Sequence, residues 1–203
     1  MIENIIFDFG DVFINLDKQA TAREMEVYGF KNLTPELEAL FTAYEKGLIT
    51  TEHFLNQTNH LFPKASRMDL IHAWNSIILD FPEQRLKFIE KLAKEEDYRL
   101  FLLSNTNELH IEFVKQRMGK ERYARFKNCF EKFYLSHEIN LRKPEPAIFE
   151  YVLNSNNLKA DKTFFVDDSK EHTSAAAGLG IRCWHLKVGK EDILDLNTQI
   201  LKC

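Results

Sequence analysis

Polar residues follow three apolar segments of the sequence, at the points where buried strands would end. They are Asp8, Gly10 and Asp11 after the first segment, Ser104 and Asn105 after the second, and Asp167 and Asp168 after the third. Carboxylates repel one another and are costly to gather unless a cation neutralises them. Because the donors of this set are oxygens, without cysteine or histidine, the expected cation is Mg²⁺ rather than zinc.

A lysine, Lys143, stands before a proline between the second and third segments. A lysine, a serine hydroxyl and backbone amides around a metal would form a receptacle for phosphate. A carboxylate beside Mg²⁺ can also attack phosphorus as a nucleophile. Each residue alone has a simpler interpretation: Asp8 as a turn residue, Ser104 as a helix cap, and Lys143 as a surface lysine. Their number and order favour a site.

The elements that would position these residues alternate between strands and helices. We expect strands at residues 4–9, 98–104, 133–136, 163–168 and 181–186, with helices between them, one of which begins at Pro144. This alternation predicts an α/β fold, a doubly wound parallel sheet with helices on both faces. Since ligands of such sheets bind outside the carboxyl ends of the strands, the polar residues would meet at one edge.

The stretch between the first and second strands has a different character. Its helical spacing, with Thr, Ser or Asp near each start, predicts a small helical bundle whose fourth helical stretch spans residues 66–80. We therefore predict an α/β core domain of residues 1–16 and 82–203, and a helical cap of residues 17–81. Glu45 and Lys46 in the cap would form either a solvated helix face or a cover over a substrate.

The composition is that of an ordinary globular protein. The chain has 203 residues, of which 44% are hydrophobic, and a net charge of −4 without a basic block. Neither nucleic acid nor a membrane is therefore an expected partner. The widely spaced Cys129, Cys183 and Cys203 are interpreted as reduced thiols, and no segment suits a signal peptide or a membrane span, so a cytoplasmic location is expected. Nothing in the sequence indicates an oligomeric state.

Four short motifs occur in order along the chain: IIFDFGDV at 5–12, LFLLSN at 100–105, RKPEPAIF at 142–149, and FFVDDS at 164–169 followed by AAAGLG at 175–180. Together they resemble the motifs of the haloacid dehalogenase-like (HAD) hydrolase superfamily, over essentially the whole chain. The stretch YEKGLITTEHF, residues 44–54, resembles the cap of a subgroup. That subgroup holds bacterial sugar-1-phosphate (glucose-1-phosphate) phosphatases and the N-terminal phosphatase domain of epoxide hydrolases.

The resemblance implies a Rossmann-like core and a Mg²⁺-dependent phosphatase acting on a small phosphorylated metabolite. An aspartyl-phosphate would form on the nucleophile and then be hydrolysed. The resemblance implies that Asp8 is the nucleophile and that Asp8, Asp168 and the carbonyl of Gly10 bind the metal, with Asp167 in contact through a water. It further implies that Ser104, Asn105 and Lys143 bind the phosphate. Lys143 would also neutralise the charge of Asp8.

Two positions depart from the family pattern. Gly10 replaces the usual second carboxylate, which acts as the general acid and is typically worth about 10²–10⁴ in rate. Either Asp11 or Asp17 replaces it, or the leaving group needs little protonation, as for the anomeric hydroxyl of a sugar 1-phosphate. His172 stands where many members carry an acidic residue, which predicts weaker Mg²⁺ binding or compensation by Asp167.

Two other functions stay open on these observations. A haloacid dehalogenase has the same fold and nucleophile but needs no metal, so the pair of Asp167 and Asp168 argues against it. A catalytically silent protein that binds a phosphorylated metabolite would explain Gly10.

Overall fold

The computed structural model describes residues 1–95 and 97–202; Cys203, one of the expected thiols, lies outside them. Within these residues, five parallel strands form one sheet in the order β3-β2-β1-β4-β5. The strands are β1 (Asn4–Phe7), β2 (Arg99–Ser104), β3 (Lys132–Leu135), β4 (Thr163–Asp167) and β5 (Arg182–His185). The predicted α/β fold with a doubly wound parallel sheet is confirmed.

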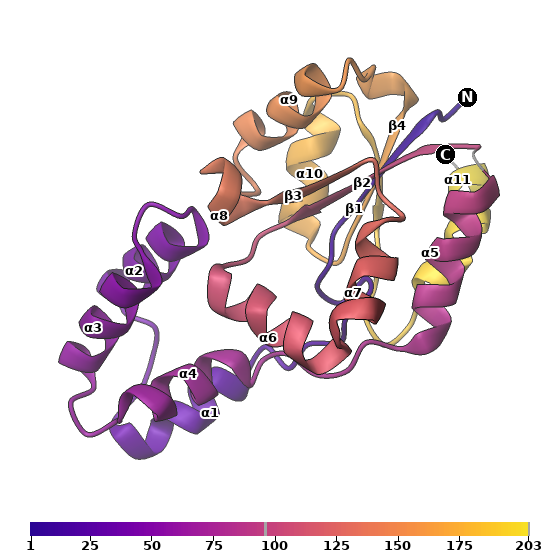
Figure 1. Cartoon of the computed structure of the whole chain (residues 1–203). Coiled ribbons are helices and arrows are strands. Elements are labelled where there is room, and N and C mark those ends of the chain that lie inside the picture. The colour runs from indigo at the N-terminus through magenta and orange to yellow at the C-terminus, as the bar shows by residue number, and fades with distance from the viewer. Residues whose placement is uncertain (96, 203) are drawn as a thin grey trace.

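Helices cover both faces of the sheet (Figure 1). One face is covered by α5 (Glu83–Glu95), α6 (Glu108–Met118), α7 (Lys120–Lys127) and α11 (Leu196–Lys202), and the other by α9 (Pro146–Ser155) and α10 (Lys170–Gly178). An apolar cluster lies on each face of the sheet. Because successive residues of a strand point to opposite faces, Ile5 and Phe7 of β1 belong to the cluster on the first face, and Ile6 belongs to the cluster on the second. All three are fully buried, which makes β1 the centre of the core.

Helices α1 (Ala20–Met25), α2 (Pro35–Glu45), α3 (Thr51–Leu61) and α4 (Arg67–Asn75) follow β1 and lie at one end of the molecule (Figure 1). The side chains of Thr34, Thr50 and Ser66 cap α2, α3 and α4 by accepting a backbone N–H bond. These helices have an apolar cluster of their own, which includes Tyr44 and Trp74. The domain boundaries at 16/17 and 81/82 stay predictions.

Four short helical segments complete the described elements: α8 (Ser136–Ile139) and the 3-10 turns Glu26–Tyr28, Ala160–Lys162 and Ile193–Asp195. Among the described residues, no helix combines the length and the apolar character that a membrane crossing requires.

Two expected helix boundaries are wrong. The helix expected to begin at Pro144 begins at Pro146, and Pro144 follows a cis peptide bond in a turn. Pro146 suits the first helical turn because that turn needs no N–H from it. The helical pattern also ran on to residue 80, whereas α4 ends at Asn75. The chain beyond it pairs with the segment that leaves β1, where Leu16 faces Ile78 in an antiparallel bridge, so the two connections between core and cap run side by side.

Candidate active site

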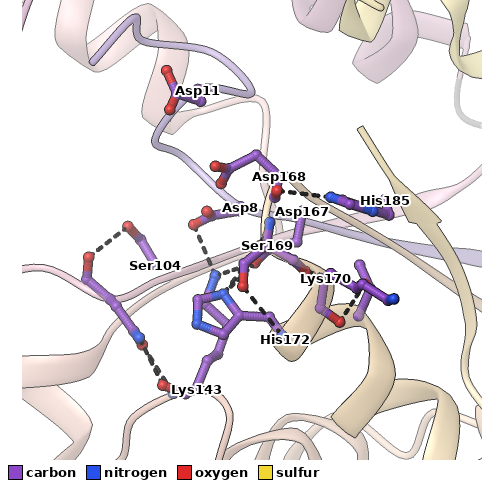
Figure 2. A network of polar contacts seen from close by, with 12 residues as sticks. Asp8, Asp11, Ser104, Lys143, Asp167, Asp168, Ser169, Lys170, His172 and His185 are labelled. Atoms are coloured by element: carbon purple, nitrogen blue, oxygen red, sulfur yellow. Dashed lines mark hydrogen bonds and ion pairs between the residues drawn. The ribbon is translucent and has the colours of Figure 1, made fainter. Parts of the chain in front are cut away.

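Three carboxylates from β1 and β4 meet at the carboxyl edge of the sheet (Figure 2). The register aligns Phe7 with Val166, and the N–H of Asp8 donates to the carbonyl of Val166 over 2.9 Å. Asp8 therefore lies beside Asp167. One oxygen from each of Asp8, Asp167 and Asp168 lies within 4.8 Å of the other two. This oxygen-only donor set fits Mg²⁺.

Lys143 lies beneath these carboxylates and is completely buried. Its Nζ is 2.8 Å from Oδ1 of Asp8 and 2.6 Å from Oδ2 of Asp167. A buried ammonium without partners would be very unfavourable, so the two carboxylates stabilise the lysine and the lysine allows them to lie close together. The alternative interpretation of Lys143 as a surface lysine is wrong.

Asp167 is held by several donors at once. Its Oδ1 accepts bonds from the N–H of Ser169 over 2.8 Å and from Nδ1 of His172 at 3.0 Å, while Oδ2 faces Lys143. Burial opposes ionisation, but Lys143 and His172 outweigh it and lower the pKa of Asp167 to about 2. The anionic Asp167 thus anchors both Lys143 and His172, and a direct metal bond would have to displace one of its donors.

Asp8 is in a different electrostatic position. Burial raises its pKa to about 7, and the nearby Asp167 and Asp168 add to this effect, against the opposing influence of Lys143. A divalent cation at the site would favour the ionised form, because it places positive charge next to the carboxylate. The ionised form is the one that can act as a nucleophile.

Two residues at the end of β2 complete this edge. Ser104 is buried, and among the described residues its Oγ makes only a long contact of 3.5 Å with the carbonyl of Asn105, too weak to fix the hydroxyl. The Asn105 side chain forms two bonds with the backbone of Lys143: Oδ1 accepts from its N–H over 2.9 Å, and Nδ2 donates to its carbonyl over 2.8 Å. The motif indicated only the backbone amide of Asn105, so this positioning of Lys143 was missed.

Gly10 leaves no room for a longer side chain without a rearrangement. A Cβ at this position would lie 2.7 Å from Cδ1 of Leu16, so an apolar side chain fills the adjoining space. The carbonyl of Gly10, the predicted metal ligand, accepts a bond from the N–H of Val12 over 2.7 Å. The position that usually carries the acid therefore borders on hydrocarbon.

The candidate replacement acids, Asp11 and Asp17, are not among the three carboxylates that lie within 4.8 Å of one another. Asp11 has a φ of 54°, and its carboxylate accepts from the N–H of Leu16 over 3.0 Å; Figure 2 shows it apart from Asp8. Asp17 is directed to Arg23, with Oδ2 2.5 Å from its guanidinium. Both carboxylates thus already stabilise the chain that leads into α1.

A cavity of about 190 Å³ opens beside Gly10 and Ser104. Its lining combines the apolar Leu16 and Ile77 with polar groups, including Glu45 at the end of α2. The carboxylate of Glu45 accepts a bond from Nε of Arg142 over 2.7 Å. Of the two interpretations of Glu45, this location favours the one that faces a ligand. Lys46 instead pairs with Glu145 at 2.7 Å.

Comparisons with known proteins agree with this geometry. The sequence model of haloacid dehalogenase-like hydrolases matches residues 5–185. A D-ribitol-5-phosphate phosphatase of Bacteroides thetaiotaomicron is 25% identical over 197 residues, which cover 94% of this chain and 95% of the relative.

Crystal structures of the HAD family enzyme bt-2542 from the same organism are also similar. A magnesium complex is 36% identical, with a TM-score of 0.83 over 93% of this chain and 95% of that one. A mutant in complex with magnesium and inorganic phosphate is 34% identical, with a TM-score of 0.81 over 94% and 96%. The predicted family is thereby confirmed: the chain belongs to the haloacid dehalogenase-like hydrolases.

Proposed function

We propose that the protein is a Mg²⁺-dependent phosphomonoester hydrolase that acts on a small phosphorylated metabolite through an aspartyl-phosphate on Asp8. The observation that carries this proposal is the position of Asp8, which shares a cation-sized space with Asp167 and Asp168 and lies 2.8 Å from the buried Lys143. The names of the similar proteins support it, since one is a phosphatase and another was crystallised with magnesium and inorganic phosphate.

In the proposed reaction, an oxygen of Asp8 forms a bond to phosphorus while the bond from phosphorus to the leaving oxygen breaks. The hydroxyl of Ser104 and the N–H of Asn105 would bind the phosphate oxygens, and Lys143 would offset their negative charge. Lys143 also contacts Oδ1 of Asp8 and so fixes the orientation of that carboxylate. Water then attacks phosphorus and the bond from phosphorus to the oxygen of Asp8 breaks. One proton of this water stays on the released phosphate, and the other passes to solvent, from which the leaving oxygen takes its proton.

Mg²⁺ would be held by Asp8, Asp168 and the carbonyl of Gly10, with Asp167 behind them through a water. When bound, the ion would supply positive charge next to the transferred phosphoryl group. His172, which donates to Asp167, would help to keep that carboxylate in position. The weaker Mg²⁺ binding expected from His172 stays a prediction.

We infer further that the preferred leaving group departs without strong protonation. Gly10 has no acid, Leu16 fills the adjoining space, and Asp11 and Asp17 are engaged elsewhere. The anomeric oxygen of a sugar 1-phosphate is a better leaving group than a primary alcohol, so this substrate class fits the site. Ribitol 5-phosphate, the substrate named for the relative, has a primary alcohol as its leaving group. Its rate is therefore the informative comparison.

The cavity beside Gly10 suits the organic part of such a substrate. Its 190 Å³ would admit a chain or ring of a few carbons, which could lie against Leu16 and Ile77. Glu45 and Thr106 also line the cavity and offer oxygens to hydroxyl groups. Because most of the lining is apolar, including Phe9, Ile14 and Ile78, these few oxygens would select the positions of hydroxyl groups rather than surround the substrate with polar contacts.

The test is phosphate release from a panel that contains glucose 1-phosphate, ribitol 5-phosphate, an aryl phosphate and a nucleotide. We expect release with Mg²⁺, none above background with EDTA, and a faster reaction with glucose 1-phosphate than with ribitol 5-phosphate. Asp8→Asn should remove the activity on every substrate. Equal rates on glucose 1-phosphate and ribitol 5-phosphate would contradict the leaving-group inference.

Two other results would contradict the phosphatase proposal itself. Halide release from 2-haloacids without Mg²⁺, in the absence of phosphate release, would indicate a dehalogenase. Thermal stabilisation by a phosphorylated ligand without turnover would indicate a binding protein.

A further inference from the structure

A second lysine, besides Lys143, pairs with the carboxylate cluster. Lys18 belongs to the segment that leaves β1 and leads into α1, and its Nζ pairs with Oδ2 of Asp168 and, at 3.0 Å, with Oδ2 of Asp11. The Lys18 side chain is 56% exposed, whereas those of Asp168 and Asp11 are only 10% and 6% exposed. A solvent-accessible cation thus covers two nearly buried anions. The motifs of the sequence do not include Lys18.

The two lysines divide the carboxylates between them. Lys143 pairs with Asp8 and Asp167, and Lys18 pairs with Asp168 and Asp11. Lys18 contacts two carboxylates and, like other lysines, carries a positive charge at neutral pH. Lys143 is locked in the core, while Lys18 has the exposure and the flexible stem needed to move away.

We propose that Lys18 and Mg²⁺ compete for Asp168, so that Lys18 lowers the affinity of the site for its metal. This inference rests on the proposed function, in which Asp168 is a metal ligand. An ammonium within bonding distance of a carboxylate repels a divalent ion on the same group, and this repulsion is strong where water is partly excluded. Mg²⁺ also demands close contacts and well-defined geometry from its ligands. Lys18 must therefore release Asp168, at least in part, when the metal binds.

Arg23 provides a matched control on the same segment. It carries the same charge and also pairs with an aspartate, Asp17, but that pair is exposed. Its removal deletes one positive charge near the start of the cap without changing the partners of Asp168.

The test is calorimetric titration of the full-length protein with MgCl₂ at low ionic strength, where charge effects are least screened. We expect Lys18→Met to bind Mg²⁺ about ten-fold more tightly than wild type, because a competing unit charge is lost. Lys18→Arg, which keeps the charge, should bind like wild type. Arg23→Met should also bind like wild type, and Asp168→Asn should show little or no binding.

The outcomes separate this inference from the proposed function. If wild type binds Mg²⁺, Asp168→Asn does not, and Lys18→Met binds with unchanged or weaker affinity, then Lys18 orients Asp168 instead of competing for it, and the inference is overturned alone. If wild type binds no Mg²⁺, the proposed function is overturned, and the inference with it.

Discussion

The carboxyl edge of the sheet and the cap are held together by different forces. At the sheet edge, Lys143 and Asp167 are fully buried and are stabilised by ion pairs and hydrogen bonds with their neighbours. In the cap, aromatic rings pack on one another: Tyr44 stacks on Phe54 at 4.2 Å, and Phe54 lies 4.8 Å from Trp74. The groups proposed for chemistry are thus held by ion pairs at the end of the sheet, while the helices of the cap are held together by apolar contacts.

The two regions meet through a few directional contacts. Trp74 of α4 donates from Nε1 to Oδ1 of the buried Asn107 over 3.1 Å, and the hydroxyl of Tyr44 accepts from the N–H of Leu109 over 3.2 Å. Ser136 donates from Oγ to the carbonyl of Glu45 over 2.6 Å. Each contact ties the cap to residues that follow the end of β2 or β3, so the position of the cap depends on the same edge that holds the site.

Replacing Lys143 with methionine would test whether ion pairs hold the sheet edge together. We expect this change to have the largest effect on the free energy of unfolding. The change leaves Asp8 and Asp167 buried next to each other without their cation, which should destabilise the fold by about 3–5 kcal/mol. Urea unfolding of the variant measures this loss, and phosphate release should disappear as well. In the control, Lys162→Met removes a surface pair with Glu3 and should leave the free energy of unfolding almost unchanged, because exposed ion pairs contribute little. Equal losses in the two variants would contradict the account.

Replacing Gly47 with alanine would test how the cap is seated. Gly47 follows α2 with a φ of 63°, and a Cβ there would lie 2.0 Å from the carbonyl oxygen of His137 in the core. The cap loop would have to move away, and a displacement of about 1 Å near a site can lower activity about 10²-fold. We therefore expect lower turnover, measured by steady-state kinetics, and a lower free energy of unfolding, measured in urea.

Gly29 offers the control for this substitution. It also has a positive φ, of 102°, but no atom lies within 4 Å of the position of its Cβ. In Gly29→Ala, backbone strain should therefore lower the free energy of unfolding by about 1–3 kcal/mol, while turnover should stay near normal. Normal turnover in Gly47→Ala would show that the cap does not depend on this contact.

His110 lies where the two regions meet, and we expect it to make the free energy of unfolding depend on pH. The effect is smaller than those above and is absent at neutral pH. Its ring stacks on Trp74, its Nε2 lies 2.9 Å from the Trp74 carbonyl, and burial lowers its pKa from 6.5 to about 4. Between these two values the unfolded chain binds the proton and the folded protein does not. The free energy of unfolding should thus fall as the pH falls from about 6.5 to 4, by up to about 3 kcal/mol in total.

Urea unfolding at pH 7.5 and pH 5 would measure this loss in wild type and in His110→Gln, which has no titrating ring. We expect the variant to lose less stability than wild type between the two pH values. An identical loss would assign the pH dependence to other groups.

The parts of the site that could be predicted from the sequence are those fixed by local context. Asp8, Ser104 and Asp167 directly end buried strands, and parallel strands bring such ends to one edge. The fold class followed in the same way from alternating elements.

The contacts of Lys18 and the Asn105 side chain could not be predicted, because they join residues far apart in the sequence. Lys18 reaches Asp168 across 150 positions, and Asn105 reaches Lys143 across 38. Polar side chains meet such distant partners only once the chain has folded, and these contacts leave no periodic pattern in the sequence. The helix boundary at Pro144 was wrong for a local reason, since two prolines two residues apart could each begin the helix.

The most direct test of the central claim is to trap the phosphoryl group on Asp8. Wild-type protein with Mg²⁺ would be mixed with the best substrate of the panel, quenched in acid within milliseconds, digested and analysed by mass spectrometry. The account predicts a phosphorylated peptide that contains Asp8, is sensitive to hydroxylamine as an acyl phosphate should be, and is absent from Asp8→Asn. Turnover by Asp8→Asn at the wild-type rate, or a phosphoryl group on another residue, would contradict it.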